Sequence, residues 1–256
     1  MTSFAFVAII WGMFSRLIYG LIEIIYPKRC LGCGKRLVGK HQSSVEEFIC
    51  LNCQSLIKRN LPPFCRSCGR RLNPKACTSN ICTSCIKNQM HFDRAFSPFL
   101  YEDTVRTLIH EFKYKRKDYL GEILANLMID FIAEYSLPID YLDLIIPIPL
   151  HKTKLREREF NQAQVLSEYI GKKFNKPVIN NVLTRNRLTK TQTGMNNQER
   201  FLNAKGSFSL TDNFALEGKN ILLVDDVLTT GATSSEASYV LKNAGANIVF
   251  VLTLAS

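Results

Sequence analysis

Four pairs of cysteines with the spacing C-x-x-C, all within residues 30–85, constrain the fold of this chain more than any other feature. Two residues between thiolates allow one tight turn to place both sulfurs on a single tetrahedral ion, so the spacing indicates zinc. No positive leader precedes the apolar start of the chain, and we therefore expect metal binding rather than the disulfides of a secreted protein. The pairs are Cys30/Cys33, Cys50/Cys53, Cys65/Cys68 and Cys82/Cys85, with Cys77 left over as a predicted spare thiol.

The cysteine pairs belong to an internal repeat. The motif Cys30-Leu-Gly-Cys33-Gly-Lys-Arg-Leu is echoed by Cys65-Arg-Ser-Cys68-Gly-Arg-Arg-Leu, and Ile49-Cys50-Leu-Asn-Cys53 is echoed by Ile81-Cys82-Thr-Ser-Cys85. Each half therefore predicts one complete zinc ribbon, with a glycine where a Cβ would obstruct the turn. Four thiolates leave no position for water, so both zinc ions are expected to be structural. We predict sequential sites, with interleaved ones as the alternative: Cys30, Cys33, Cys50 and Cys53 on one ion, and Cys65, Cys68, Cys82 and Cys85 on the other.

The segment before the cysteines is apolar, but charges interrupt it. Arg16 and Glu23 break the run, whereas a membrane-spanning helix needs about 20 consecutive apolar residues. We expect an amphipathic helix over residues 1–27, or translation that starts at Met13, and peripheral contact with a membrane stays an alternative. The expected organisation is this helix, a double zinc ribbon over residues 28–90 and a larger domain over residues 91–256.

Positive charge is concentrated in the cysteine-rich region. The chain has a formal net charge of +11, and residues 28–90 hold 12 of its 33 Lys and Arg residues against 2 of its 22 acids. Such a surface attracts a polyanion such as single-stranded DNA, although a basic face that only aids solubility has the same composition. The whole chain is 46% hydrophobic and 21% charged, which excludes extended disorder.

Beyond about residue 92, predicted strands alternate with predicted helices. Apolar spacing predicts helices around residues 105–112, 120–131, 160–174 and 233–243, and short apolar runs predict strands at 144–146, 178–183, 221–224 and 248–253. This alternation is typical of a mainly parallel sheet with helices on both faces, and such sheets bind ligands beyond the carboxyl ends of their strands. The predicted fold class is therefore α/β.

One strand-to-helix segment, Ile221-Leu-Leu-Val-Asp-Asp-Val-Leu-Thr-Thr-Gly-Ala-Thr233, carries the clearest chemistry. Two adjacent acids at the end of a buried strand cannot both be buried without partners, so we expect at least one to meet a ligand, a metal or solvent. The glycine permits close approach of a ligand, and free N–H groups at a helix start attract phosphate. Thr233 and Glu236 also predict a capping box at this helix start. A tight turn without any ligand is the alternative interpretation.

The order of apolar strand, two acids and T-T-G-x-T resembles the phosphoribosyl pyrophosphate signature of type I phosphoribosyltransferases. The double cysteine module and three further segments resemble the ComF family, which is associated with natural competence. Glu159 departs from the family pattern, which usually has glycine in R-G-F-N-Q. The three segments are Ile146-Pro-Ile-Pro-Leu-His151, Arg156-x-Arg-x-Phe-Asn-Gln162, and Gln192-Thr-Gly194 together with Glu199-Arg-x-x-Asn203.

The resemblance implies a phosphoribosyltransferase-like domain with a site for phosphoribosyl pyrophosphate and Mg²⁺. Asp225 and Asp226 are the implied catalytic acids, in contact with the ribose hydroxyls. Arginine suits the pyrophosphate, and residues 184–197 would form a loop that closes over the site. The remaining implied residues are Thr229, Thr230, Gly231, Ala232 and Thr233 for the 5-phosphate, Arg156 and Arg158 for the pyrophosphate, and Asn161 and Gln162 for orienting oxygen atoms.

As for function, the resemblance implies a protein of natural competence and DNA uptake. Such a protein would bind phosphoribosyl pyrophosphate or a related sugar phosphate and handle single-stranded DNA in the cytoplasm or at the inner face of the membrane. Other competence proteins would be its partners. The alternative is an active phosphoribosyltransferase of nucleotide metabolism, which would transfer the phosphoribosyl group to an acceptor and release pyrophosphate. The sequence names neither the acceptor nor a general base for that reaction.

Overall fold

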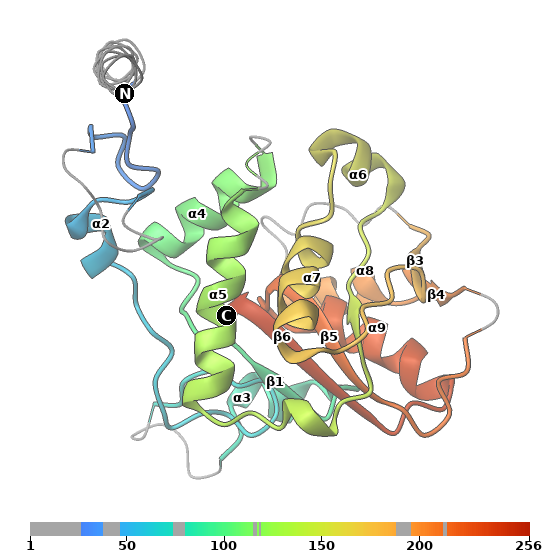
Figure 1. The fold of residues 1–256 in the computed structure, drawn as a ribbon. Helices are drawn as coiled ribbons and strands as arrows, with labels where there is room; N and C mark the ends of the chain where they lie inside the picture. The colour runs from blue at the N-terminus through green and yellow to red at the C-terminus, as the bar shows by residue number, and fades with distance from the viewer. Residues whose placement is uncertain are drawn as a thin grey trace, which may run out of the picture. The chain divides into compact units, whose positions relative to one another are not determined.

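The computed structural model in Figure 1 describes residues 27–37, 47–73, 80–114, 117, 119–187, 196–211 and 214–256. The chain forms two compact units, residues 1–56 and residues 57–256, which are described separately. Cys77, the expected helix over residues 1–27 except for Pro27, and most of the expected loop over residues 184–197 lie outside the described residues. Within the described ranges, no helix combines the length and the apolar character needed to cross a lipid bilayer.

The unit of residues 1–56 contains the first cysteine ribbon. An antiparallel bridge between Arg29 and Arg36 closes its first turn. The backbone N–H of Leu31 donates to the carbonyl oxygen of Phe48 at 2.8 Å, which ties the first cysteine pair to the second. The short helix α2 (Leu51–Ser55) then carries the last cysteine of this ribbon.

The unit of residues 57–256 is built on a parallel sheet of four strands. Its order is β1 (Arg94–Phe96), β6 (Ile248–Ala255), β5 (Asn220–Val227) and β2 (Leu144–Pro147), and each neighbouring pair is parallel. The run Ile221–Val224 is buried on both sides, since a central parallel strand has helices over each face. The predicted parallel sheet is thus confirmed.

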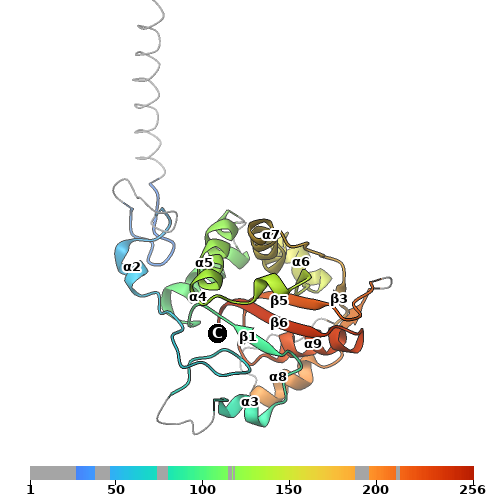
Figure 2. The same ribbon diagram turned by 60° about the horizontal axis from the view of Figure 1, so that its bottom comes forward.

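Helices cover both faces of this sheet, as Figure 2 shows. One face carries α5 (Leu120–Glu134) and α7 (Gln162–Phe174), with α4 (Asp103–Tyr114) beside α5. The other face carries α9 (Ala232–Asn243), which packs against α8 (Asn197–Ala204). Helices α5 and α7 approach closely at Gly121, where a Cβ would lie 2.3 Å from Val165 Cγ1. The expectation of helices on both faces is also confirmed.

The predicted strand over residues 178–183 is wrong as a single element. Val178 forms only an isolated parallel bridge with Ile145. The chain then turns, and β3 (Leu183–Arg185) pairs with β4 (Phe208–Leu210) in a separate antiparallel ladder. Strand β1 was not predicted, because three residues are too few to show a period. Among its described residues, this unit also contains the short helices α3 (Thr83–Lys87), η1 (Ile139–Tyr141) and α6 (Lys152–Arg158).

The second cysteine ribbon packs into the core of this larger unit. Cys65 and Cys68 belong to the same buried cluster as residues of β2 and β5. The N–H of Ala95 donates to the carbonyl oxygen of Ser67 at 2.7 Å, so the turn of the ribbon covers the outer edge of β1. Gly69 is required at this contact, because a Cβ there would lie 2.2 Å from the carbonyl oxygen of Ala95. The domain boundaries expected near residues 28 and 91 stay a prediction.

Candidate functional site

Two clusters of four cysteines each gather their sulfur atoms as the sequential arrangement requires. In each cluster the sulfurs lie within 4.8 Å of one another. The distances Cys33 Sγ to Cys50 Sγ, 3.7 Å, and Cys68 Sγ to Cys82 Sγ, 3.6 Å, are close to the value of about 3.8 Å that tetrahedral zinc with Zn–S bonds of about 2.3 Å imposes. All-sulfur donors with this geometry fit a structural zinc ion. The clusters are Cys30, Cys33, Cys50 and Cys53, and Cys65, Cys68, Cys82 and Cys85.

The two ribbons share their backbone geometry as well as their sequence. The N–H of Cys50 donates to Cys30 Sγ at 3.3 Å, and the N–H of Cys82 donates to Cys65 Sγ at the same distance. Such N–H groups stabilise a thiolate, which is the form that binds zinc. Gly34 and Gly69 occupy the same turn position with φ of 74° and 69°, a conformation in which glycine is unstrained.

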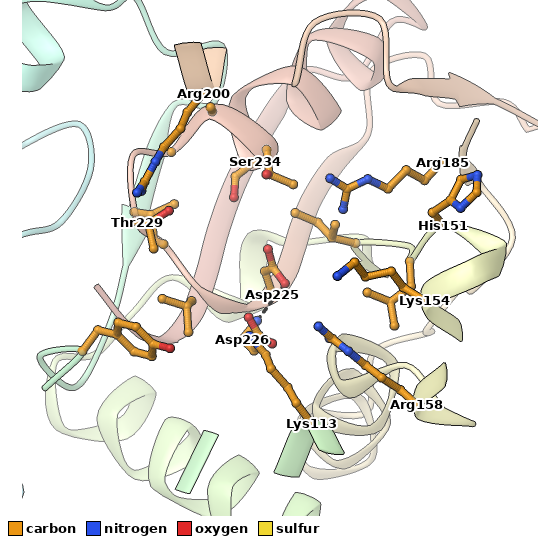
Figure 3. A pocket seen from close by; sticks show the side chains of 18 of the residues that line it. Lys113, His151, Lys154, Arg158, Arg185, Arg200, Asp225, Asp226, Thr229 and Ser234 are labelled. Atoms are coloured by element: carbon orange, nitrogen blue, oxygen red, sulfur yellow. Dashed lines mark hydrogen bonds and ion pairs between the residues drawn. The ribbon is translucent and has the colours of Figure 1, made fainter. Parts of the chain in front are cut away.

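A cavity of about 470 Å³ opens at the carboxyl ends of β2 and β5 in the unit of residues 57–256. This is the edge at which parallel sheets bind their ligands. Figure 3 shows Asp225 and Asp226 in the middle of the cavity, with Arg200 and Thr229 on one side of the acids. On the other side lie the cationic groups of Lys154, Arg158 and Arg185, together with His151.

The two acids of the cavity have close polar neighbours. The N–H of Asp226 donates to Asp225 Oδ1 at 2.9 Å. Asp226 is only 9% exposed, and its Oδ2 lies 2.7 Å from Lys113 Nζ, at the end of α4. The acids therefore face the cavity, and one of them holds a cation that the protein itself supplies.

Burial and charge set the ionisation of this cluster. Burial raises the pKa of Asp225 to about 7; the negative charge of Asp226 adds to this effect, whereas Lys113 and Arg185 oppose it. Burial alone would lower the pKa of Lys113. The negative charge of Asp226, and to a smaller extent that of Asp225, outweighs burial, so the pKa is raised. Burial also lowers the pKa of Arg185, although the charge of Asp225 counters part of this. The cavity thus holds an acid that titrates near neutral pH.

The loop after the acids forms one wall of the cavity and leads directly into α9. Thr229, Gly231, Ala232 and Thr233 line this wall. Thr230 does not line it: this residue is 7% exposed, and its Oγ1 accepts the N–H of Ala232 at 3.3 Å. The first N–H groups of a helix have no partner within the helix, so this wall suits an anion.

The predicted capping box at Thr233 and Glu236 is wrong. Helix α9 begins at Ala232, and its N-cap is Gly231 in the left-handed conformation with φ of 83°. The carboxylate of Glu236 instead accepts the N–H of Gly206 at 2.6 Å. Thr233 therefore lies inside the helix rather than at its N-cap, and Glu236 binds a distant backbone group instead of closing a capping box.

Arg156 and Arg158, which the resemblance implies for the pyrophosphate, lie on the short helix α6 (Lys152–Arg158). Its Lys154 and Arg158 line the cavity, whereas Arg156 is exposed and does not. The guanidinium of Arg158 lies over the ring of Tyr114 and donates to Gln162 Oε1 at 2.9 Å.

Asn161 and Gln162 support the wall of the cavity without lining it. Asn161 caps α7, since its Oδ1 accepts the N–H of Ala163 at 3.1 Å, and its Nδ2 donates to the carbonyl oxygen of Ile148 at 3.0 Å. Gln162 is 1% exposed and acts through Arg158. Both residues thus hold other groups in place in this structure.

Lys113, Arg185 and Arg200 are among the cations of the cavity that carried no assignment from the sequence. Lys113 lies outside the apolar stripe of its helix, and no local pattern could connect it with Asp226. Signals for the other two existed. Arg185 belongs to the basic segment of residues 184–197, and Arg200 to the motif Glu199-Arg-x-x-Asn203.

Comparison with known proteins relates nearly the whole chain to competence proteins. Competence protein F of Haemophilus influenzae is 30% identical over 230 residues, which are 89% of this chain and 96% of that protein. Competence protein ComFC of Bacillus subtilis is 29% identical over 195 residues, 73% of this chain and 75% of that protein. DNA utilization protein YhgH of Salmonella typhimurium is 28% identical over 230 residues, 89% of this chain and 96% of that protein.

Two further comparisons concern separate parts of the chain. Glutamine phosphoribosylpyrophosphate amidotransferase of B. subtilis overlaps 56% of this chain and 30% of its own, with 18% identity and a TM-score of 0.34, an overlap too loose to bear on function. The double zinc ribbon domain matches residues 21–88. With this domain and with the identity and coverage shared with competence protein F, the chain belongs to the ComF family, and its double zinc ribbon precedes an α/β domain in the sequence.

Proposed function

We propose that the cavity binds a 5-phosphorylated ribose, with phosphoribosyl pyrophosphate as its first candidate. One observation carries this proposal: a single cavity holds an acidic pair between a helix N-terminus on one side and a cluster of cations on the other. The ligand has the matching order of charges, because its ribose hydroxyls lie between a phosphate and a pyrophosphate. Charge complementarity of this kind orients a ligand as well as attracting it.

Each part of the ligand has a proposed position. The 5-phosphate lies on the wall formed by Thr229, Gly231 and Thr233, where helix α9 begins. The ribose hydroxyls face Asp225 and Asp226, whose carboxylate oxygens accept hydrogen bonds. The pyrophosphate lies on the opposite side, against Lys154, Arg158 and Arg185.

The acidic pair also suits Mg²⁺. Carboxylate oxygens and phosphate oxygens are the donors that this ion prefers, and Asp225 and Asp226 offer carboxylates at the proposed ribose position. A bound Mg²⁺ would neutralise charge on the pyrophosphate. Lys113 contacts Asp226 at 2.7 Å and would have to share that carboxylate with the incoming ligand.

The same binding would be the first half of a transfer reaction, which is the second candidate function. An acceptor would attack the anomeric carbon, the bond from that carbon to the pyrophosphate oxygen would break, and pyrophosphate would leave. The cations of Arg158 and Arg185 favour this candidate, because they could stabilise the charge that develops on the leaving group. The acceptor of this transfer stays unassigned.

At the level of the cell, we propose that the protein serves DNA uptake in the cytoplasm. Relatives at about 30% identity are named competence and DNA utilization proteins. The basic ribbons would bind single-stranded DNA through its phosphates, and thiolate–zinc sites suit a reducing compartment. Other competence proteins are the expected partners, and contact with the inner face of the membrane would come from the N-terminal segment.

Isothermal titration calorimetry with phosphoribosyl pyrophosphate and Mg²⁺ tests the binding proposal. The double variant Asp225→Asn, Asp226→Asn should abolish Mg²⁺-dependent binding, because amides neither attract the cation nor accept hydroxyl hydrogen bonds as strongly. Asp130→Asn is the charge-matched control, since Asp130 is exposed on α5, and it should bind like the wild type.

A second variant guards against misfolding of the first. Thr233→Val removes one hydroxyl from the proposed phosphate wall and leaves the buried ion pair of Lys113 and Asp226 intact. It should weaken binding by about fivefold, the usual effect of one lost hydrogen bond. Equal affinity in the wild type and the double variant, or no binding by the wild type, would refute the proposal.

A further inference from the structure

We propose that the second zinc ribbon holds one wall of the ligand cavity in its binding conformation. Arg70 is the positioning residue through which the ribbon does this. This inference rests on the proposed function and concerns how the phosphate wall is held. Arg70 follows Cys68 by two residues, and its side chain leaves the ribbon to meet the loop after β5. The first ribbon has a lysine, Lys35, at the same place in the repeat, and it belongs to the other compact unit.

Arg70 fixes one peptide group of the phosphate wall. Its Nη2 donates to the carbonyl oxygen of Leu228 at 3.1 Å, while the N–H of Leu228 donates to the carbonyl oxygen of Ala255 at 2.9 Å. The carbonyl and N–H groups of a trans peptide point in opposite directions. Holding the Leu228 carbonyl therefore also fixes the direction of the Thr229 N–H, at a residue that lines the cavity.

Without that hydrogen bond, the Leu228–Thr229 peptide could rotate. A rotated peptide would turn its carbonyl oxygen toward the space where the phosphate is proposed to lie, and two negatively polarised oxygens repel each other. A hydrogen bond from a charged donor favours the unrotated arrangement more strongly than a neutral one. Arg70 thus keeps the wall ready for an anion.

The segment that follows the second ribbon, residues 90–92, packs against the next part of the same wall. Met90 follows Cys85 by five residues, and its Sδ lies 3.3 Å from the place where a Cβ on Gly231 would be. Phe92 Cε1 lies 3.7 Å from the same point. Gly231 has the left-handed conformation that starts α9. The ribbon segment therefore packs directly beneath the residue at which the phosphate wall bends.

His91 connects the same segment to the first turn of α9. Its backbone N–H donates to Ser235 Oγ at 3.1 Å, and its Nδ1 lies 3.0 Å from the same oxygen. The ring of His91 also contacts the ring of Tyr239 edge-on, with centroids 4.9 Å apart. The helix start is thereby attached to the ribbon at two successive turns.

These contacts depend on the folded ribbon, because two separate segments of it supply them. Arg70 follows the first cysteine pair and residues 90–92 follow the second, so the Cys65, Cys68, Cys82 and Cys85 cluster fixes the two segments relative to each other. The ribbon is itself anchored, since Asn60 Nδ2 donates to the carbonyl oxygens of both Gly69 and Ser97 at 2.9 Å. Order at the metal cluster is thus transmitted to the loop by a short and contiguous set of contacts.

Hydrogen exchange in the unliganded protein tests the positioning role directly. Arg70→Gln should increase exchange of the amides in residues 228–235, because it removes the charged bond to the Leu228 carbonyl. Arg70→Lys should restore part of the protection. Arg71→Gln is the matched control, since it removes the same charge from the next, exposed residue and should leave this segment unchanged. Zinc content and melting temperature should match the wild type in all three variants.

Ribose 5-phosphate is the binding probe, since it carries the phosphate without the pyrophosphate. Arg70→Gln should weaken its calorimetric affinity by about fivefold to tenfold, as expected for one hydrogen bond from a charged donor. The loss should persist at high salt. A role through charge alone would fade as salt screens it, and Arg71→Gln would then show a similar loss.

Each outcome decides between the two proposals. Unchanged exchange in residues 228–235 of Arg70→Gln, or an affinity loss that disappears at high salt, would overturn the positioning role. Faster exchange together with a wild type that binds no ribose 5-phosphate would support the positioning role and refute the proposed function. Faster exchange and weaker binding in Arg70→Gln alone would support both.

Discussion

The carboxyl groups of Asp225 and Asp226 are neighbours in the chain, but they meet different surroundings at the end of β5. Asp226 is paired with Lys113, whose Nζ lies 2.7 Å from its Oδ2. Asp225 accepts the N–H of Asp226, and burial raises its pKa to about 7. The two carboxyl groups therefore have different partners, and a buried carboxyl group with a raised pKa, such as that of Asp225, is typical of binding and catalytic sites.

The raised pKa predicts pH-dependent binding. Asp225 is protonated below about pH 7, and a neutral carboxyl group is a poorer acceptor for ribose hydroxyls and a poorer ligand for Mg²⁺. Affinity for phosphoribosyl pyrophosphate with Mg²⁺ should therefore rise by about tenfold between about pH 6 and about pH 8. The measurement is calorimetry across this range with wild type and Asp225→Asn. Parallel pH profiles of the two proteins would contradict the assignment, because the phosphates of the ligand titrate equally in both.

The raised pKa of Asp225 favours ligand binding at high pH, but it favours the folded state at low pH. The folded protein keeps the Asp225 proton above the ordinary value of 3.8, at which the unfolded chain releases it. The contribution of this group to the free energy of unfolding is therefore complete below about pH 4 and is lost as the pH rises toward 7. Asp225→Asn removes this dependence, so the difference in stability between the two proteins should change over that window.

At the scale of an element, α6 shows how a helix end can be strained by one residue. Glu159 is its C-cap and has the left-handed φ of 68°, where a Cβ is unfavourable. The N–H of Glu159 donates to the carbonyl oxygen of Leu155 at 2.8 Å, so the turn is fully formed despite the side chain. The next helix begins three residues later, with Asn161 as its cap. The family glycine at this place therefore has a backbone reason: it is the residue that this turn accommodates without strain.

Glu159→Gly should stabilise the protein. The left-handed conformation costs about 1–2 kcal/mol for a residue with a Cβ, and the greater entropy of glycine in the unfolded chain offsets part of the gain. We expect the free energy of unfolding to rise by about 0.5–1 kcal/mol in urea denaturation. Glu159→Ala is the control, since it removes the carboxylate but keeps the Cβ, and it should bring no gain. Equal stabilities of the glycine and alanine variants would show that backbone strain at this position is negligible.

At the scale of the whole molecule, the two ribbons belong to different compact units although they share one motif. The second ribbon packs into the core beside the cavity. From the sequence, Arg70 was only one residue of a basic surface, but in the structure it donates to the carbonyl oxygen of Leu228. The exposed arginines of the two ribbons include Arg36 and Arg66. The DNA-binding proposal therefore depends on such exposed cations, while Arg70 belongs to the cavity.

Affinity for single-stranded DNA should fall steeply with salt, since phosphate contacts release counterions. The double variant Arg36→Gln, Arg66→Gln should bind more weakly, and the slope of log affinity against log salt should become less steep by about 1.4. Fluorescence anisotropy with a labelled oligonucleotide at several salt concentrations measures both quantities. The control is Lys172→Gln, Lys173→Gln, which removes the same charge from exposed positions on α7. Salt-independent binding, or equal slopes for both double variants, would count against DNA binding by the ribbons.

The features predicted from the sequence are those that local spacing encodes. Two residues between cysteines bring their sulfurs together without reference to the rest of the fold, and a repeat shows which pairs combine. The alternation of apolar strands and helices indicated a parallel sheet, and Asp225 and Asp226 follow a buried strand whose end must lie at the edge that binds ligands. Each of these inferences needs only neighbours in the chain.

The tertiary structure decided the contacts between residues that are far apart in the sequence. Lys113 meets Asp226, Arg70 meets Leu228 across 158 positions, and Glu236 leaves its expected cap to bind Gly206. No period or motif of a single segment contains such pairs, because they form only when the sheet, helices and second ribbon pack against one another. The sequence by itself therefore determined the two cysteine clusters, the layered fold and the position of the acids. Packing alone determined which cations surround the acids and which side chains hold the loop beside them.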